Sequence, residues 1–218
     1  DVGMRPSREL ELPIVFEDEH ILVVDKPHGM LSVRGRGPTR QDCVESRLQS
    51  REATTEDWPR VAHRLDLATS GLLVAAKHRE ALVGLQRQFS AREVDKRYIA
   101  VVEGVVKGRE GLIDFPLGRD LQDRPRQCYD PQRGKAARTR WRVLGSEGER
   151  TRVELCPETG RTHQLRLHCA HARGLGAPIV GDRLYGFGGE RLHLHAAALA
   201  FQHPVISASL RFDSACPF

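Results

Sequence analysis

Residues 61–77 read VAHRLDLATSGLLVAAK, a cluster of charged and hydroxyl residues that runs into an apolar segment. Leu72–Ala76 is short and continuous enough for a buried β-strand. The polar residues should therefore lie where a core element ends. Asp66 stands between two leucines, so its carboxyl group should be partly desolvated, and such a group stays ionised only beside a cation. Taken alone, the residues favour a structural ion pair between Asp66 and Arg64, or another Arg, over catalysis.

The chain after this stretch predicts a helix and then a second buried strand. Apolar residues from Ala81 to Phe89 recur at helical spacing, which indicates an amphipathic helix over His78–Ala91. Tyr98–Val102 is β-rich and apolar on both parities, which is typical of a central strand covered on both faces.

The remaining elements do not alternate regularly between strand and helix. Helices are expected over Asp42–Arg51 and over Arg161–Ala172, the second with Thr162 as its N-cap. This order favours the α+β class, with a mixed, mostly antiparallel sheet flanked by helices and loops. The other expected strands are Ile14–Phe16, Ile21–Val24, Thr139–Leu144, Thr151–Cys156, Leu192–Phe201 and Ser207–Phe212.

Length and composition exclude several classes of protein. The 218 residues allow one large domain or two small ones. No apolar run approaches the ~20 residues that cross a bilayer, and residues 1–11 lack the basic start and apolar stretch of a secretion signal. The five widely spaced cysteines contain no C-x-x-C pair, which argues against a disulfide framework and favours a cytoplasmic location.

The positive charge is concentrated in one stretch. The chain has 29 Arg and 5 Lys, with a formal net charge of +5. Residues 118–142 contain eight basic and three acidic residues, a local excess as large as that of the whole chain. Such an excess is expected for a polyanion partner, and the guanidinium group suits phosphate. A solvated loop without a partner would give the same pattern.

A second polar cluster, Pro157–His168, reads PETGRTHQLRLH. On a helix, His163 and Arg166 would share a face. His163, His168 and His171 suggest zinc, but the first two are five residues apart and would project to different sides of a helix. No carboxylate stands beside them at ligand spacing, so a metal is disfavoured.

Together these motifs resemble the RluA-type pseudouridine synthase family. His63–Lys77 is similar to its HRLDxxTSGLLxxAK signature, and the resemblance continues in family order over roughly residues 14–213. One departure is Ala177, where the family often has His. The other motifs are KPxG at Lys26–Gly29, KxYxA at Lys96–Ala100, PLxRD at Pro116–Asp120, KxAxT at Lys135–Thr139, GRTHQ[IL]R at Gly160–Arg166, PIxGDxxYG at Pro178–Gly186 and LHA at Leu194–Ala196.

The resemblance implies a fold and a reaction. It implies a pseudouridine synthase catalytic domain over 14–213, in two halves around a central active-site cleft, after an N-terminal extension of 1–13. The chain leaves no room for an S4 RNA-binding domain, so it resembles the short form of the family. Members isomerise uridine in RNA to pseudouridine without cofactor or metal. The implied substrates are 23S ribosomal RNA, the tRNA anticodon stem-loop, or both. We expect a monomer, since no heptad or apolar dimer stripe is present.

The resemblance also assigns roles to individual residues. Asp66 would be the catalytic carboxylate, and Arg166 the ionic partner that keeps it charged. Tyr98 would lie against the flipped uracil and assist removal of the C5 proton. Arg64 would fill the space that the uridine leaves. The remaining RNA-binding candidates are His63, Leu194 as the opposite wall of the pocket, and Arg119, Arg138 and Arg140 from the basic stretch.

Two other functions remain open from the sequence. The same fold could serve as a non-catalytic RNA-binding or ribosome-assembly module. The three histidines could instead belong to a metal-dependent nuclease. Whether the carboxylate adds to the sugar or assists formation of a glycal also stays open.

Overall fold

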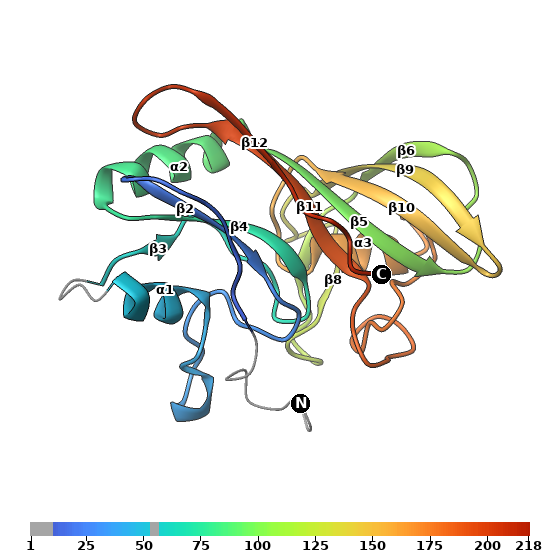
Figure 1. Ribbon diagram of the computed structural model, residues 1–218. Coiled ribbons are helices and arrows are strands. Elements are labelled where there is room, and N and C mark those ends of the chain that lie inside the picture. The colour runs from blue at the N-terminus through green and yellow to red at the C-terminus, as the bar shows by residue number, and fades with distance from the viewer. Residues whose placement is uncertain (1–10, 53–56) are drawn as a thin grey trace. The chain divides into compact units, whose positions relative to one another are not determined.

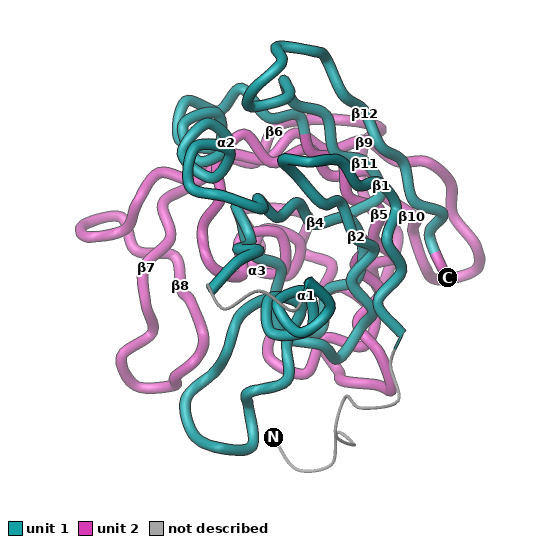
Figure 2. The backbone as a smooth tube through the Cα atoms, turned by 60° about the vertical axis from the view of Figure 1, so that its left-hand side comes forward, with its two compact units in different colours: residues 1–95, 196–216 teal, residues 96–195, 217–218 magenta. Residues whose placement is uncertain are grey.

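The computed structural model describes residues 11–52 and 57–218, and the chain divides into two compact units (Figure 2). Unit 1 comprises residues 1–95 and 196–216, and unit 2 comprises 96–195 and 217–218. Most of the predicted extension 1–13 lies outside the described residues. The boundaries of the single catalytic domain predicted over 14–213 stay a prediction.

Unit 1 is built on a sheet whose strands follow the order β1-β2-β4-β11 (Figure 1). Strand β1 pairs antiparallel with β2, and β2 antiparallel with β4. The strands predicted in this part of the chain are confirmed. The bounds are β1 Ile14–Glu17, β2 Ile21–Lys26, β3 Arg60–Val61 beside β4, β4 Ser70–Ala76, β11 Leu194–Gln202 and β12 Ser209–Asp213 beside β11.

The core of unit 1 lies between this sheet and helix α2 (Arg79–Ala91). Every residue of β4 is buried, which explains why its Leu72–Ala76 segment is continuously apolar instead of alternating. Ala81 and Leu85 of α2 are fully buried in the same cluster, so the predicted amphipathic helix is confirmed. Helix α1 (Val44–Glu52) buries Val44 and Leu48, which lie four residues apart on one face of the helix.

Gly71 allows two strands of unit 1 to approach closely. Its φ is +115°, and a Cβ built there would lie 2.4 Å from the carbonyl oxygen of Ala196 in β11. Any side chain would force the strands apart, so only glycine fits where β4 begins.

Unit 2 contains a sheet with the order β5-β10-β9-β6 and a separate pair, β7-β8. All of these pairings are antiparallel, in agreement with the predicted α+β class. Val153 and Leu155 of β10 are buried, as their alternation predicts. The bounds are β5 Asp95–Glu103, β6 Glu110–Asp114, β7 Leu117–Arg119, β8 Gln127–Tyr129, β9 Arg138–Glu147, β10 Arg150–Pro157 and α3 Gln164–Ala170.

The predicted helix over Arg161–Ala172, capped by Thr162, is wrong at its beginning. Helix α3 begins at Gln164, and its N-cap is His163, which has a left-handed φ of 53° and makes no capping side-chain bond. The side chain of Gln164 causes the difference, because its Oε1 accepts the backbone N–H of Arg161 at 3.0 Å and holds that residue in a turn. His163 therefore stands before the helix and does not share a helical face with Arg166.

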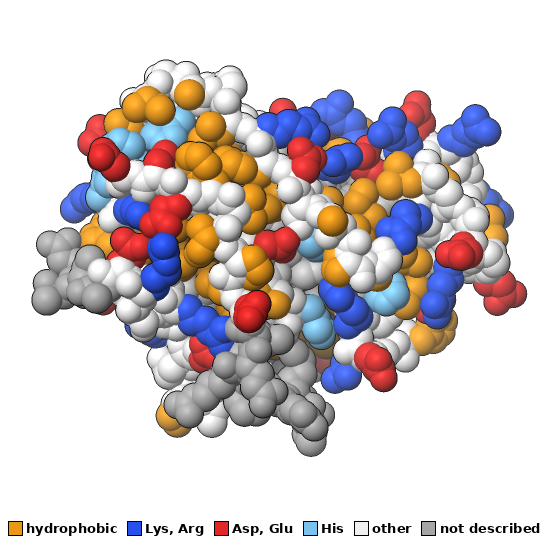
Figure 3. Space-filling model, viewed as in Figure 1, with side chains coloured by type: hydrophobic (Ala, Val, Ile, Leu, Met, Phe, Trp, Pro, Cys, Tyr) orange, Lys and Arg blue, Asp and Glu red, His pale blue; other side chains and the backbone are white. Residues whose placement is uncertain are grey.

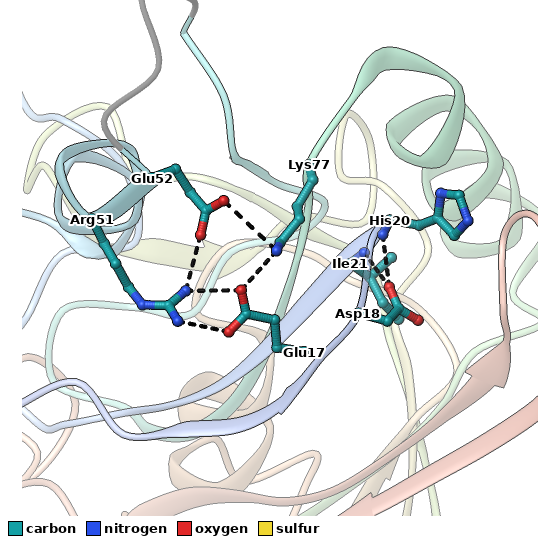
Figure 4. Close-up of polar contacts among 7 residues, drawn as sticks. All are labelled: Glu17, Asp18, His20, Ile21, Arg51, Glu52 and Lys77. Carbon is teal, nitrogen blue, oxygen red and sulfur yellow. Dashed lines mark hydrogen bonds and ion pairs between the residues drawn. The ribbon is translucent and has the colours of Figure 1, made fainter.

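A charged network at the end of β1 ties together three parts of unit 1 (Figure 4). The carboxylate of Glu17 accepts hydrogen bonds from Arg51 of α1 and from Lys77, which follows β4, each at 2.7 Å. Glu52 lies 2.9 Å from Arg51 and 3.7 Å from Lys77. The hydrogen bond from Arg51, followed by that from Lys77, lowers the pKa of Glu17 to about 2.

We expect Glu17→Gln to lower the melting temperature at pH 6 and to have a much smaller effect near pH 2. The folded-state pKa of Glu17 lies below its ordinary value of 4.5, so its stabilising contribution is complete above pH 4.5 and is lost as the pH falls toward 2. Thermal melts of wild type and variant between pH 2 and pH 7 measure this. Glu19→Gln, an exposed change two residues away, is the control. A wild-type advantage as large at pH 2 as at pH 6 would contradict the assignment.

Candidate active site

Asp66 lies in the connection between β3 and β4 of unit 1. Its backbone carbonyl accepts the N–H of Thr69 at 3.0 Å, which closes a tight turn just before β4. The residue is half-buried, and the preceding Leu65 is 6% exposed. The carboxyl group is therefore held at the end of a core strand and is partly withdrawn from water.

The segment Lys26–Ser32 forms hydrogen bonds with the backbone of the Asp66 turn. These bonds involve backbone atoms of three residues around Asp66, and none of them uses the Asp66 side chain. The turn is therefore set independently of its carboxyl group. The bonds are Gly29 N and Lys26 Nζ to the Leu67 carbonyl (2.9 and 3.3 Å), His28 Nδ1 with the Ala68 carbonyl (3.0 Å), Ser32 Oγ to the Leu65 carbonyl (2.8 Å) and Leu65 N to Ser32 Oγ (3.0 Å).

Lys26 adds a buried amine beside this turn. The side chain is fully buried, and its Nζ also donates to the carbonyls of Pro27 and Met30, at 3.0 and 2.8 Å. Burial lowers the pKa of Lys26 to about 7, while the charges of Asp66 and Asp25 act in the opposite direction. Lys26 was not among the predicted site residues. The only sequence signal was its place at the start of the KPxG motif.

The two residues before Leu65 lie in different environments. Arg64 is exposed, and its predicted role in filling the space that the uridine leaves stays a prediction. His63 is half-buried: its Nε2 accepts the backbone N–H of Val74 at 3.2 Å, and its ring stacks on Phe89 with centroids 4.6 Å apart. These contacts give His63 a structural role in unit 1, and its predicted role in RNA binding stays a prediction.

In unit 2, Arg166 of α3 forms a two-bond ion pair with Asp182. Nε lies 2.8 Å from Oδ2 and Nη2 lies 2.6 Å from Oδ1, and both residues are buried. Burial raises the pKa of Asp182, but the hydrogen bonds and charge of Arg166, with two backbone N–H groups, more than offset it and hold that pKa below its ordinary value. Asp182 stands in the PIxGDxxYG motif, but nothing in the sequence marks it as the partner of Arg166.

The two predicted walls of the uracil pocket have different exposure. Tyr98 is half-buried in β5, where its backbone pairs with Leu155 of β10. Leu194 is 3% exposed at the start of β11. The predicted ionic contact of Asp66 with Arg166, and the predicted roles of Tyr98 and Leu194 beside uracil, remain predictions.

In the structure, acidic side chains lie close to several arginines of the basic stretch, residues 118–142. Figure 3 shows Lys and Arg side chains gathered over β9 and β10 with acidic side chains among them. Arg119, in β7, is exposed. The predicted excess over residues 118–142 is therefore partly neutralised by carboxylates from outside that range. The ion pairs are Arg138 with Asp114 (3.1 Å) and Glu158 (3.4 Å), Arg140 with Glu158 (2.9 Å), and Arg142 with Glu154 (2.9 Å).

The three histidines considered for zinc each have another partner. His163 Nδ1 lies 2.9 Å from the hydroxyl of Tyr185, and His168 Nδ1 lies 2.9 Å from the hydroxyl of Thr139. His171 Nδ1 accepts the backbone N–H of Arg173. Within residues 11–52 and 57–218, no group of three His, Cys, Asp or Glu side chains is arranged to hold a metal ion, and no helix is long and apolar enough to cross a membrane.

Comparison with known proteins identifies the class to which this fold and site belong. The sequence pattern of the family described as RNA pseudouridylate synthase matches residues 20–171, which include both the Asp66 turn and Arg166. The chain belongs to this family. The predicted fold class and enzyme class are confirmed, so the alternative of a non-catalytic module is set aside.

Individual relatives narrow the comparison. A dual-specificity RNA pseudouridine synthase RluA of Vibrio vulnificus is 45% identical over 203 residues, which cover 88% of this chain and 78% of that protein. The protein of the same name from Escherichia coli K12 is 42% identical over 223 residues, covering 98% and 97%. The solved structure of human RNA pseudouridylate synthase domain containing 1 is 30% identical, with a TM-score of 0.78 over 99% of this chain and 87% of that one. The chain is thus an RNA pseudouridine synthase similar to RluA.

Proposed function

We propose that this enzyme converts uridines of 23S ribosomal RNA, of the tRNA anticodon stem-loop, or of both into pseudouridine, with Asp66 as the catalytic carboxylate. The observation that carries the proposal is the Asp66 turn. A half-buried carboxylate is held there by backbone bonds beside a buried lysine, in a chain that matches the family over this segment. The name of the relatives, dual-specificity RNA pseudouridine synthase, supports more than one RNA substrate.

The reaction requires the target uridine to leave its stack, since folded RNA shields the C1′ bond. The N1–C1′ bond breaks, the uracil turns over, and C5 bonds to C1′. The C5 proton then passes to solvent and N1 takes up a proton, so atoms and charge balance. A single carboxylate suffices because uracil leaves as an anion and needs no second carboxyl group to protonate it, unlike the leaving group of a glycosidase.

The other residues support this step in distinct ways. Arg166 is the proposed ionic partner of Asp66, since a desolvated carboxylate without a cation would take up a proton. Tyr98 lies against the uracil and assists loss of the C5 proton, with Leu194 on the opposite side of the base. Arg64, which is exposed, enters the space that the flipped nucleotide leaves.

RNA binding outside the pocket rests on charge and shape. Arg119, Arg138 and Arg140 are the proposed phosphate contacts, with His63 close to the flipped nucleotide; RNA phosphates would compete with Glu158 and Asp114 for Arg138. Aromatic residues make up 6% of the chain, too few for a stacking platform along single strands. Recognition of a folded stem-loop fits this composition better. We further propose a cytoplasmic monomer that works without cofactor or metal.

Release of tritium from RNA that carries 5-tritiated uridine tests the function. We expect the purified enzyme to release tritium from a 23S rRNA transcript, from a tRNA anticodon stem-loop, or from both, because C5 loses its hydrogen when it bonds to C1′. The matched control is each RNA with its stem sequence scrambled, which removes the fold and keeps the composition. If neither folded RNA releases tritium under conditions where an RluA relative is active, the proposed substrates are wrong.

A further inference from the structure

The proposed reaction gives no role to Asp182, which forms the buried ion pair with Arg166 in unit 2. We propose that Asp182 is a positioning residue, which sets the orientation of the Arg166 guanidinium group before RNA binds. This inference rests on the proposed role of Arg166, and it assigns to Asp182 no contact with RNA.

The two hydrogen bonds between Arg166 and Asp182 fix the orientation of the guanidinium plane as well as its distance from the carboxylate. Asp182 accepts from Nε and from Nη2 of Arg166 with its two different oxygens, at 2.8 and 2.6 Å. Two parallel bonds of this kind hold the guanidinium plane, whereas a single bond would let it rotate. Of the five N–H donors of an arginine, this fork takes two, and it thereby determines the directions of the other three.

The carboxylate of Asp182 is itself held in place. Its Oδ1 accepts the backbone N–H groups of Leu184 and Tyr185, at 2.8 and 3.0 Å, and the residue is fully buried. The backbone carbonyl of Asp182 accepts from Gly186 and Gly188 at 3.1 and 3.0 Å, so the chain folds tightly around this residue. These bonds fix the position of the Asp182 carboxylate. The position of the carboxylate in turn determines where the Arg166 guanidinium group lies.

Tyr185 supports the same group from another side. The Arg166 guanidinium carbon lies 5.3 Å from the centre of its ring. The Tyr185 hydroxyl accepts the backbone N–H of Gln127 in β8 at 2.7 Å and lies 2.9 Å from Nδ1 of His163. The turn that carries Asp182 is thus anchored to β8 and to the N-cap of α3, the helix that carries Arg166.

Pre-orientation explains why a buried arginine is paired in this way. An arginine side chain has four rotatable bonds, and holding it still before the reaction removes an entropic cost from the catalytic step. The hydrogen bonds and charge of Arg166 also keep the pKa of Asp182 low, so the fork stays ionised at neutral pH. The pair carries no net charge, so the contribution of Asp182 is orientation and not added positive charge.

A double-mutant cycle with Asp182→Asn and Arg166→Met tests the inference. Asparagine keeps the size of the side chain and removes its charge and one acceptor. We expect Asp182→Asn to lower the single-turnover rate of tritium release about 30-fold or more while the Kd for RNA stays within about 3-fold, as for an interaction used only in the transition state. Because Asp182 acts through Arg166, Asp182→Asn should cause no further loss in the Arg166→Met background.

Asp42→Asn is the matched control. Asp42 pairs with Arg47 through the same two-bond geometry, at 2.7 and 2.8 Å, and belongs to no proposed site, so this variant should keep the wild-type rate. If Asp182→Asn does not fold, Asp182→Glu decides instead: it keeps the charge but displaces the fork, and a slower rate with unchanged RNA affinity is expected. A folded Asp182 variant with the wild-type rate, or the same fractional loss with and without Arg166, would overturn the inference.

An Asp66→Asn arm separates this inference from the function on which it rests. If Asp66→Asn is inactive and the Asp182 variant is fully active, only the positioning role fails. If Asp66→Asn is active, the proposed catalytic role of Asp66 fails, and if wild type releases no tritium from these RNAs, the proposed substrates fail.

Discussion

Replacing Asp66 with Ala should abolish tritium release from the RNA substrates, lowering the single-turnover rate by about 10⁴-fold or more, the scale of losing a principal catalytic group. The reason is chemical: without the carboxylate, nothing placed at C1′ can add to the sugar or assist formation of a glycal. The fold should be unaffected, since the bonds that hold the Asp66 turn come from Lys26, His28, Gly29 and Ser32 and go to its backbone. The melting temperature should therefore stay close to that of wild type.

Two further variants make the Asp66 experiment decisive. Asp66→Asn keeps the shape of the side chain and should be as inactive as Asp66→Ala. Asp25→Asn removes the other carboxylate whose charge acts on the buried Lys26, and it should keep activity within about 5-fold of wild type, because Asp25 has no proposed role at the sugar. Tritium release that Asp66→Ala leaves unchanged would refute the mechanism.

The parts of the fold that sequence predicts well are those where local pattern and tertiary environment agree. Leu72–Ala76 is apolar at every position, and β4 is buried at every position. Helix α2 follows it with apolar residues at helical spacing, and Ala81 and Leu85 enter the core as the spacing requires. No long-range contact is needed to read either element from the chain.

The beginning of α3 could not be predicted, because a contact distant in sequence sets it. The amide of Gln164 donates to the backbone carbonyl of Arg138 and accepts from Thr159. These bonds fix the preceding turn with His163 in a left-handed conformation. A local rule that assigns Thr162 as the cap has no access to that contact.

The charge of the basic stretch also depends on contacts that are distant in sequence. A count over residues 118–142 finds an excess of arginines, yet sheet pairing brings Glu154 of β10 beside Arg142 of β9. Glu158, next to the end of β10, likewise lies within 2.9 Å of Arg140. The acidic partners of these arginines lie outside residues 118–142, so a count over that stretch cannot find them. The pairing of the strands brings them together.

In the candidate site, too, some residues can be recognised from the sequence and others only from the structure. Asp66 is conspicuous in sequence, since it stands between two leucines just before an apolar segment. The groups that hold the site together are not, because Lys26 reaches the Leu67 carbonyl across 41 positions and Arg166 reaches Asp182 across 16. Sequence therefore singles out Asp66 as a candidate, and the structure shows which distant groups hold the turn that carries it.

Arg166→Met should greatly reduce turnover, by about 100-fold or more in single-turnover rate, while RNA affinity stays within a few-fold of wild type, since this is the scale on which loss of one preorganised charge slows a reaction. The change removes the proposed cation of Asp66 and leaves the phosphate contacts intact. Tritium release and filter binding of the same folded RNA measure the two quantities separately.

Stability must be followed in the same experiment, because Arg166→Met leaves Asp182 buried without its counterion. Removing one partner of a buried pair costs about 3–5 kcal/mol, so the melting temperature should fall. Adding Asp182→Asn removes the unpaired charge and should restore part of that stability without restoring activity. Arg166→Lys keeps the charge but cannot form the two-bond fork with Asp182, so it should fold and fall between wild type and Arg166→Met in rate. Normal turnover in a folded Arg166→Met variant would exclude the guanidinium from the reaction.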